Sequence, residues 1–183
     1  GGNIGIPALD LLSLKADIVV LELSSFQLET VLNAGLDVAC ILNVTPDHMD
    51  RYASFMDYFS AKQRIYFGAK TVVYNLDDPL TIPPKIDAVK RFGFSEFSNK
   101  EDNETQYVYD KVSDQVLRGS ETISARSDIR LQGTHNVKNA LALFAICDAV
   151  GVDFCYARQY LAEFSGLAHR CEMVRSISST SFI

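Results

Sequence analysis

Three apolar runs alternate with helical patterns in the first 78 residues of the chain. The runs lie at 17–23, 36–44 and 70–78, and the second is apolar almost throughout, which is typical of parallel strands that are covered on both faces. The third has a polar exit. Residues 54–69 space their apolar side chains near the helical period, with Ser54 as the expected N-cap. This alternation predicts an α/β protein with a doubly wound, mostly parallel sheet and helices on both faces.

Shorter helices are expected at 7–14, where Pro7 lies near the first turn, and at 25–33. After Pro79 the chain becomes more polar, and 85–130 contain only short candidate strands. These candidates are 88–94, 106–112 and 115–120, and they predict a small, mostly antiparallel β segment. Two strong helices follow, 136–151 closed by Gly151 and 155–164 ended at Gly166, and 175–183 have the pattern of a strand.

Composition narrows the function classes. A chain of 183 residues with 48% hydrophobic and 22% charged residues is sufficient for one globular domain. Its net charge of −6 offers no basic surface, so we expect no nucleic-acid partner, although an anionic small ligand is compatible with it. The four cysteines form no close pair, which favours a reducing compartment. No apolar run approaches about 20 residues, so we expect no membrane partner.

Polar side chains follow each of the three expected strands. They are Glu22 with its neighbouring serines, the loop 43–50, and Asn75 with the two aspartates that follow it. Ligands bind beyond the carboxyl ends of strands in open α/β sheets, and adjacent strands would bring Glu22 close to His48. Glu22 at the end of a buried strand needs a partner, either an ion pair, solvent at the strand end or a metal ion. A carboxylate with an imidazole suits Zn²⁺ better than Mg²⁺.

Other candidates each have an ordinary structural alternative. Lys62 lies on the expected helix, where a lysine is most often solvated, and Asn3 in "GGNIG" could serve as a helix cap. Asn136 and Asn139 are one helical turn apart in "GTHNVKNA", and Asn136 is as readily an N-cap as a ligand contact. The His-Arg pair at 169–170 could contact phosphate or be exposed. The chain contains no GxxxxGK[ST] phosphate loop.

Six motifs together resemble a known family. They occur in the order "GGNIG", "LELSSFQLE", "ILNVTPDHMDRY", "AKQRIY", "GTHNVKNA" and "LAHR". They resemble the central domain of the Mur ligases, most closely the members that add D-glutamate. The resemblance is strong over 1–78 and 131–173 and weaker over 85–130. It implies a central ATP-binding domain at 1–175 whose phosphate loop lies upstream of this chain, with 176–183 beginning the connection to a C-terminal domain.

The resemblance also implies a reaction. The family forms an amide bond with ATP, and here the substrates would be UDP-N-acetylmuramoyl-L-alanine, D-glutamate and ATP, with two Mg²⁺ ions. The reaction belongs to peptidoglycan synthesis in the bacterial cytoplasm, and we expect a monomer. The whole protein would be the ligase, and this chain alone would be inactive. The alternatives are a relative that adds another amino acid, a folylpolyglutamate synthase relative, and a non-catalytic module that binds a nucleotide sugar.

Residue roles follow from the same motifs. Glu22 and His48 would bind Mg²⁺, and Lys62 matches the lysine that the family carbamylates to N6-carboxylysine, an anionic metal ligand. His48 and Lys62 would be the catalytic residues. Asn3 and Ser24, together with His48, would hold the UDP-sugar.

The nucleotide contacts implied by the resemblance lie in the second half of the chain. Asn139, with Asn136, would contact the adenine side of ATP. Arg170 would reach the nucleotide, with His169 nearby as a weaker candidate.

Overall fold

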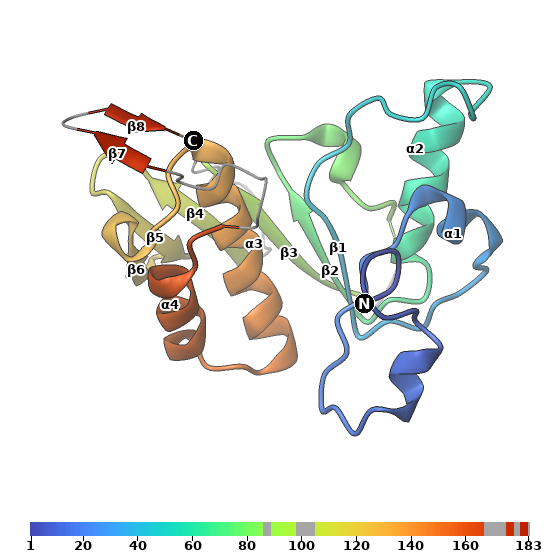
Figure 1. Cartoon of the computed structure of the whole chain (residues 1–183), viewed down its shortest axis with the longest axis horizontal. Coiled ribbons are helices and arrows are strands. Elements are labelled where there is room, and N and C mark those ends of the chain that lie inside the picture. The colour runs from blue at the N-terminus through green and yellow to red at the C-terminus, as the bar shows by residue number, and fades with distance from the viewer. Residues whose placement is uncertain (86–88, 98–104, 167–174, 178–179, 183) are drawn as a thin grey trace.

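The computed structural model is an α/β fold with helices on both faces of one main sheet, which confirms the expected fold class (Figure 1). It describes residues 1–85, 89–97, 105–166, 175–177 and 180–182. Two residues with an expected nucleotide role, His169 and Arg170, lie outside this part. Among the described residues, no helix is both long and apolar enough to cross a bilayer.

The main sheet has six strands in sequential order. They are β1 (Val38–Ile41), β2 (Thr71–Asn75), β3 (Lys90–Ser95), β4 (Thr105–Asp110), β5 (Gln115–Arg118) and β6 (Glu121–Ala125). The first four strands are parallel, and β4, β5 and β6 pair antiparallel. The mostly antiparallel segment expected after residue 85 is therefore wrong for β3 and correct from β4 onward. The connection from β2 is long enough for a crossover, so β3 starts at the same end as β2, with Thr71 opposite Lys90.

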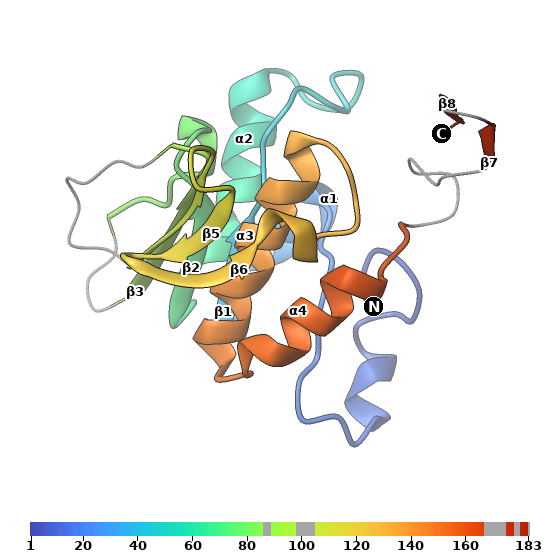
Figure 2. The same cartoon turned by 90° about the vertical axis from the view of Figure 1, so that its left-hand side faces the viewer.

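Side chains of β2 alternate between two hydrophobic clusters. Val72 and Tyr74 pack with residues of α2 (Phe55–Gln63) and of the 3-10 turn η2 (Arg64–Tyr66). Val73 faces the opposite side, where the core is formed with α3 (Thr134–Val150). All five residues of β2 are buried because helices cover both faces of the sheet. The last helix, α4 (Phe154–Glu163), packs beside α3 (Figure 2).

The helix ends follow local sequence signals. Ser54 is the N-cap of α2, as predicted, and its hydroxyl accepts a hydrogen bond from Asp57 N. α3 ends at Gly151, which has the left-handed φ of 74° that a helix-terminating glycine supplies. Of the two alternatives for Asn136, the helix cap is wrong, because α3 begins at Thr134 and its N-cap is Gly133.

The short helix α1 (Ser25–Thr30) is fastened to the segment that follows α2. Arg64 Nε donates to Leu28 O at 2.8 Å, and its Nη2 donates to Val31 O at 2.6 Å. These carbonyls belong to the end of α1, where Leu28 O also accepts from Val31 N at 3.2 Å and Val31 O lies beyond the last residue of the helix. Arg64 thus fixes α1 against the rest of the fold.

The strand expected at 17–23 is absent from the described fold. Only Glu22 pairs, through a single isolated parallel bridge to Gly2, and the Val20 side chain is 75% exposed. An apolar run becomes a strand only when neighbours supply hydrogen bonds on its edges, and here only Gly1 to Asn3 do so. The helix expected at 7–14 is reduced to a 3-10 turn, Asp10–Ser13.

The end of the chain also differs from the expectation of one strand. β7 (Arg175–Ile177) and β8 (Thr180–Phe182) pair antiparallel in a separate two-stranded sheet.

Candidate functional site

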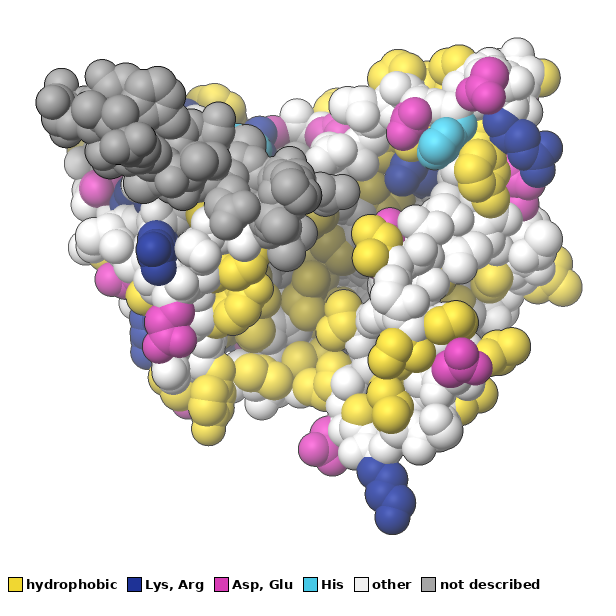
Figure 3. Space-filling model, in the orientation of Figure 1, with side chains coloured by type: hydrophobic (Ala, Val, Ile, Leu, Met, Phe, Trp, Pro, Cys, Tyr) yellow, Lys and Arg dark blue, Asp and Glu magenta, His cyan; other side chains and the backbone are white. Residues whose placement is uncertain are grey.

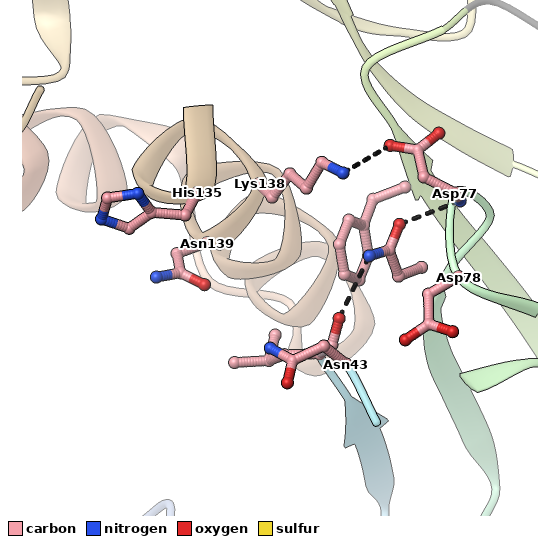
Figure 4. A pocket seen from close by; sticks show the side chains of 9 residues that line it. Asn43, Asp77, Asp78, His135, Lys138 and Asn139 are labelled. Atoms are coloured by element: carbon pink, nitrogen blue, oxygen red, sulfur yellow. Dashed lines mark hydrogen bonds and ion pairs between the residues drawn. The ribbon is translucent and has the colours of Figure 1, made fainter. Parts of the chain in front are cut away.

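A pocket of about 230 Å³ lies at the carboxyl ends of β1, β2 and β3, against the first turns of α3 (Figure 4). Its lining residues are Leu42, Asn43, Asn75, Asp77, Asp78, Phe94, His135, Lys138 and Asn139. This edge of the sheet is where open α/β folds bind ligands. The volume is below the roughly 300–1,000 Å³ of pockets that hold a whole drug-sized ligand, so it suits one end of a larger molecule.

Two side chains at the exit of β2 fasten neighbouring strand ends together. Asn75 is buried, and its Nδ2 donates to Leu42 O at 3.2 Å. Asp78 accepts from Val44 N at 2.9 Å and from Leu80 N at 3.1 Å. Both of these side chains therefore shape the pocket, because their polar atoms are engaged with the chain itself.

Asp77 is the most heavily hydrogen-bonded carboxylate of the pocket. It accepts from Ser95 Oγ at 2.5 Å and from Glu96 N at 3.0 Å, and it pairs with Lys138 Nζ at 3.1 Å. Burial alone would raise the pKa of Asp77. The hydrogen bonds from Glu96 and Ser95 and the charge of Lys138 outweigh burial and lower this pKa below its ordinary value. Asp77 therefore stays ionised around neutral pH.

The asparagines expected to contact a nucleotide behave differently. Asn139 lines the pocket, and its side chain makes no hydrogen bond with any described residue. The same is true of Asn43, which lies across the pocket (Figure 4). Asn136 does not line the pocket, and its Nδ2 donates to Gln132 O at 2.7 Å. Of the two, only Asn139 presents a free amide to a ligand there.

Asn3 and Glu22 lie together in a second group of expected site residues. Asn3 Nδ2 donates to Glu22 Oε2 at 3.2 Å, and Asn3 N donates to Glu22 O at 2.7 Å. Gly2 has φ 101°, and a Cβ on it would lie 2.4 Å from Glu22 O, so this approach requires glycine. The hydroxyl of Ser24 accepts from Gln27 N in the cap of α1. The serine therefore has a structural role whether or not it also meets a ligand.

His48 lies on an exposed loop that packs against α1. Its φ of 55° is in the left-handed region, and its backbone N–H donates to Asp47 Oδ1. The imidazole ring is 4.9 Å from the ring of Phe26, which stacks in turn on Tyr52. These contacts fix His48 beside the helix that Ser24 caps.

Lys62 points its ammonium at an aromatic ring. Lys62 Nζ lies 5.3 Å from the ring centroid of Tyr58, and no contact joins it to Glu22 or His48 within the described residues. Nowhere in that part of the chain do three or more His, Cys, Asp or Glu side chains gather as a metal site. Mg²⁺, however, is commonly held by one or two carboxylates with substrate phosphates, and the exposed carboxylate of Glu22 fits that mode.

A hollow separates the two halves of the surface. Figure 3 shows it between the part that carries α1 and α2 and the part that carries α3 and α4, with apolar side chains along its walls. The second group of expected site residues, which begins with Asn3 and Glu22, belongs to the part that carries α1 and α2.

Sequence reasoning missed two residues that line the pocket and one that pairs with its wall. It assigned no role to His135, Lys138 or Glu96, although the first two lie within the quoted "GTHNVKNA". Lys138 lies directly before Asn139, so its place on the same helix was available. Glu96 reaches this edge only because β3 is parallel to β2, which the pattern did not predict.

Known proteins resemble this chain in sequence and in fold. The family model described as "Mur ligase middle domain" matches residues 3–147. The chain is 51% identical to the UDP-N-acetylmuramoylalanine–D-glutamate ligase of Saccharophagus degradans and 47% identical to that of Teredinibacter turnerae. Each match covers 100% of this chain and 40% of the relative, so the chain spans about two fifths of these curated relatives.

Solved structures show the same fold at lower identity. A UDP-N-acetylmuramoyl-L-alanyl-D-glutamate–2,6-diaminopimelate ligase superposes with a TM-score of 0.67 at 24% identity, over 86% of this chain and 34% of the other. A UDP-N-acetylmuramate-alanine ligase from Thermotoga maritima gives 0.56 at 20% identity, over 85% and 35%. Since the family match covers most of the sequence and the fold agrees, the chain belongs to the Mur ligase family and contains its middle domain.

Proposed function

We propose that the chain is the middle domain of an ATP-dependent ligase that adds D-glutamate to UDP-N-acetylmuramoyl-L-alanine in peptidoglycan synthesis. The observation that carries the proposal is the 51% identity, over the whole chain, to a ligase named for this reaction. Solved relatives named for diaminopimelate or alanine are only 24% and 20% identical. The choice of D-glutamate therefore rests on sequence similarity, and the pocket supports the nucleotide part.

The reaction has two steps. The carboxylate of the L-alanine residue attacks the γ-phosphate of ATP, which gives an acyl phosphate and ADP. The amine of D-glutamate then attacks the acyl carbon, and inorganic phosphate leaves as the amide forms. Enzymes accelerate phosphoryl transfer mainly by positioning and charge stabilisation, so the residues of this domain need to hold the reactants rather than react themselves.

The pocket at the carboxyl edge of the sheet takes the adenine end of ATP in this proposal. Asn139 supports it, because its amide faces the pocket without a partner among the described residues, and an amide can pair with the donor and acceptor edge of adenine. A contact from Asn136 requires its hydrogen bond to Gln132 to open. Arg170, with His169 as the weaker candidate, is proposed to reach the nucleotide on the strength of the family motif.

The second group of residues is proposed to hold the UDP-sugar and the metal. Asn3 and Ser24 would orient the sugar nucleotide, with His48 facing the reacting carboxylate. Glu22 and His48 would bind the two Mg²⁺ ions, which when bound would neutralise the charge that develops on the transferred phosphate. Carbamylation of Lys62 would replace an ammonium, which repels a cation, with an anionic oxygen ligand.

The surroundings of the reaction are part of the same proposal. A ligase of this type works in the bacterial cytoplasm, where its nucleotide substrates are found, and we expect the protein to act as a monomer.

The test is product formation by the full-length protein. The protein is incubated with Mg²⁺, ATP and UDP-N-acetylmuramoyl-L-alanine, and in turn with D-glutamate, L-glutamate, L-alanine and diaminopimelate. Mass spectrometry should detect the amide product with D-glutamate alone, with one phosphate released per product. A product with another amino acid would assign the protein to a different branch of the family. Binding of the sugar nucleotide without any product would indicate a binding module.

A further inference from the structure

Lys138 joins α3 to two strand exits at the wall of the pocket. Its Nζ lies 3.1 Å from Asp77 Oδ2 and 3.8 Å from Glu96 Oε1. The lysine side chain is 30% exposed, whereas those of Asp77 and Glu96 are 12% and 8% exposed. Figure 4 shows Lys138 extending from α3 to Asp77. Lys138, which borders the pocket, thus places its positive charge beside two nearly buried carboxylates.

Buried side chains hold α3 in place in addition to the ion pair. The helix is anchored in the core by buried side chains, which include Val137, Leu141 and Phe144. Asp77 also keeps two other donors, Ser95 Oγ and Glu96 N. Among the residues that the structure describes, Lys138 is the cation that pairs with Asp77.

That charge matters because the wall is acidic. Asp77 and Asp78 line the pocket, and Glu96 lies directly behind Asp77, paired on its other oxygen with Lys111 at 3.0 Å. Lys111 is 49% exposed and is not a lining residue, so solvent screens it more than Lys138. Removing Lys138 would therefore take the described cation away from Asp77 and leave Glu96 paired with the more exposed Lys111, so the wall of the pocket would become more negative.

We propose that Lys138 is a specificity-determining residue that compensates the carboxylates of Asp77 and Glu96, so that the pocket accepts an anionic nucleotide as well as the neutral nucleoside. The inference rests on the proposed nucleotide role of the pocket. It assigns Lys138 an electrostatic effect on the phosphates, without direct contact and without a role in shaping the pocket.

The test compares ligands that share the base and differ in charge. Binding of adenosine and ADP to the full-length protein is measured by isothermal titration calorimetry without magnesium, at low salt and at about 1 M salt. Lys138→Met should weaken ADP by roughly tenfold, the effect of a unit charge at about 10 Å in an effective dielectric near 20. Adenosine should change less than about twofold, and the loss for ADP should shrink at about 1 M salt, where the screening length is about 3 Å.

Three variants complete the design. Lys138→Arg keeps the charge and should bind ADP as the wild type does. Lys138→Met with Asp77→Asn restores the charge balance and should recover most of the lost ADP affinity. Lys70→Met, which removes an exposed lysine paired with Asp37 at the opposite end of β2, is the matched control and should leave both ligands unaffected.

The outcomes separate this inference from the proposed function. If the wild type binds neither adenosine nor ADP, the nucleotide role fails and the inference fails with it. If the wild type binds both but Lys138→Met weakens them equally, or weakens neither, only the electrostatic role is overturned. If the double variant recovers no affinity, Lys138 contacts the phosphates directly, and charge compensation is wrong.

Discussion

Replacing Asp78 by alanine should destabilise the fold at the edge that carries the pocket. The carboxylate accepts from Val44 N, directly after the exit of β1, and from Leu80 N, in the 3-10 turn that follows β2. Truncation leaves both backbone donors without this acceptor. Val44 begins the segment that leads to His48. The change should therefore loosen the connection between the pocket and the loop that carries His48.

The magnitude follows from these two contacts. Loss of a capping side chain costs about 1 kcal/mol. Loss of a hydrogen bond to a charged acceptor costs about 1.5–3 kcal/mol. Asp78 is only half-buried, so water replaces part of the acceptor, and we expect a loss of about 2 kcal/mol in the free energy of unfolding. For a chain of this size that corresponds to roughly 4–8 °C in Tm.

Urea denaturation followed by circular dichroism and by tyrosine fluorescence measures this loss, provided that the two transitions coincide. Asp37→Ala is the control, because the Asp37 side chain is 78% exposed and its ion pair among the described residues is with Lys70, itself 75% exposed. It should change stability by less than about 0.5 kcal/mol. If Asp78→Ala costs no more than Asp37→Ala, the carboxylate does not hold the strand exits together.

Four further predictions concern single site residues. The folded pKa of Asp77 is below its ordinary value of 3.8, so the stability it contributes is present above that value and is lost as the pH falls through the folded pKa. Urea midpoints measured between pH 2.5 and 6 should therefore fall less steeply in Asp77→Asn, and identical slopes would contradict this. Asn139→Ala should weaken ADP binding in calorimetry by roughly tenfold, the loss of one good base contact, whereas Asn136→Ala should have a smaller effect; the reverse order would remove Asn139 from the base site. Lys62→Ala should be nearly inactive and partly rescued by short carboxylic acids, and the intact wild type should show the added mass of carbon dioxide. Glu22→Ala should retain the circular dichroism spectrum and lose most turnover, and near-normal turnover would exclude the proposed metal role.

The sequence predicted elements whose signals are local. The run 36–44 contains β1 and 70–78 contains β2, Ser54 caps α2, and Gly151 ends α3. These signals depend on a residue's own backbone or on a short apolar period, so no knowledge of neighbours is needed.

The failures share a dependence on distant partners. The direction of β3 is set by where the connection from β2 returns, which its own pattern does not record. The run 17–23 has the composition of a buried strand but pairs only at Glu22. Whether such a run becomes a strand depends on the neighbours available at its edges.

The candidate site shows the same difference between features with a local sequence signal and features that depend on distant partners. Asn139 lines the pocket, while the Asn136 amide donates to a backbone carbonyl, and the contact of either residue with a nucleotide stays a prediction. Lys138 and Glu96 meet only because two strand exits and a helix converge, so no sequence spacing could reveal their pairing. The metal roles of Glu22 and His48 and the carbamate at Lys62 stay predictions.

The central claim is that the pocket between α3 and the carboxyl edge of the sheet binds the nucleotide. The most direct test is a crystal structure of the full-length protein with ADP. The account predicts the adenine ring in this pocket, with the Asn139 amide within hydrogen-bond distance of the base and the Lys138–Asp77 pair intact beside it. ADP bound elsewhere, with Asn139 remote from the base, would contradict it.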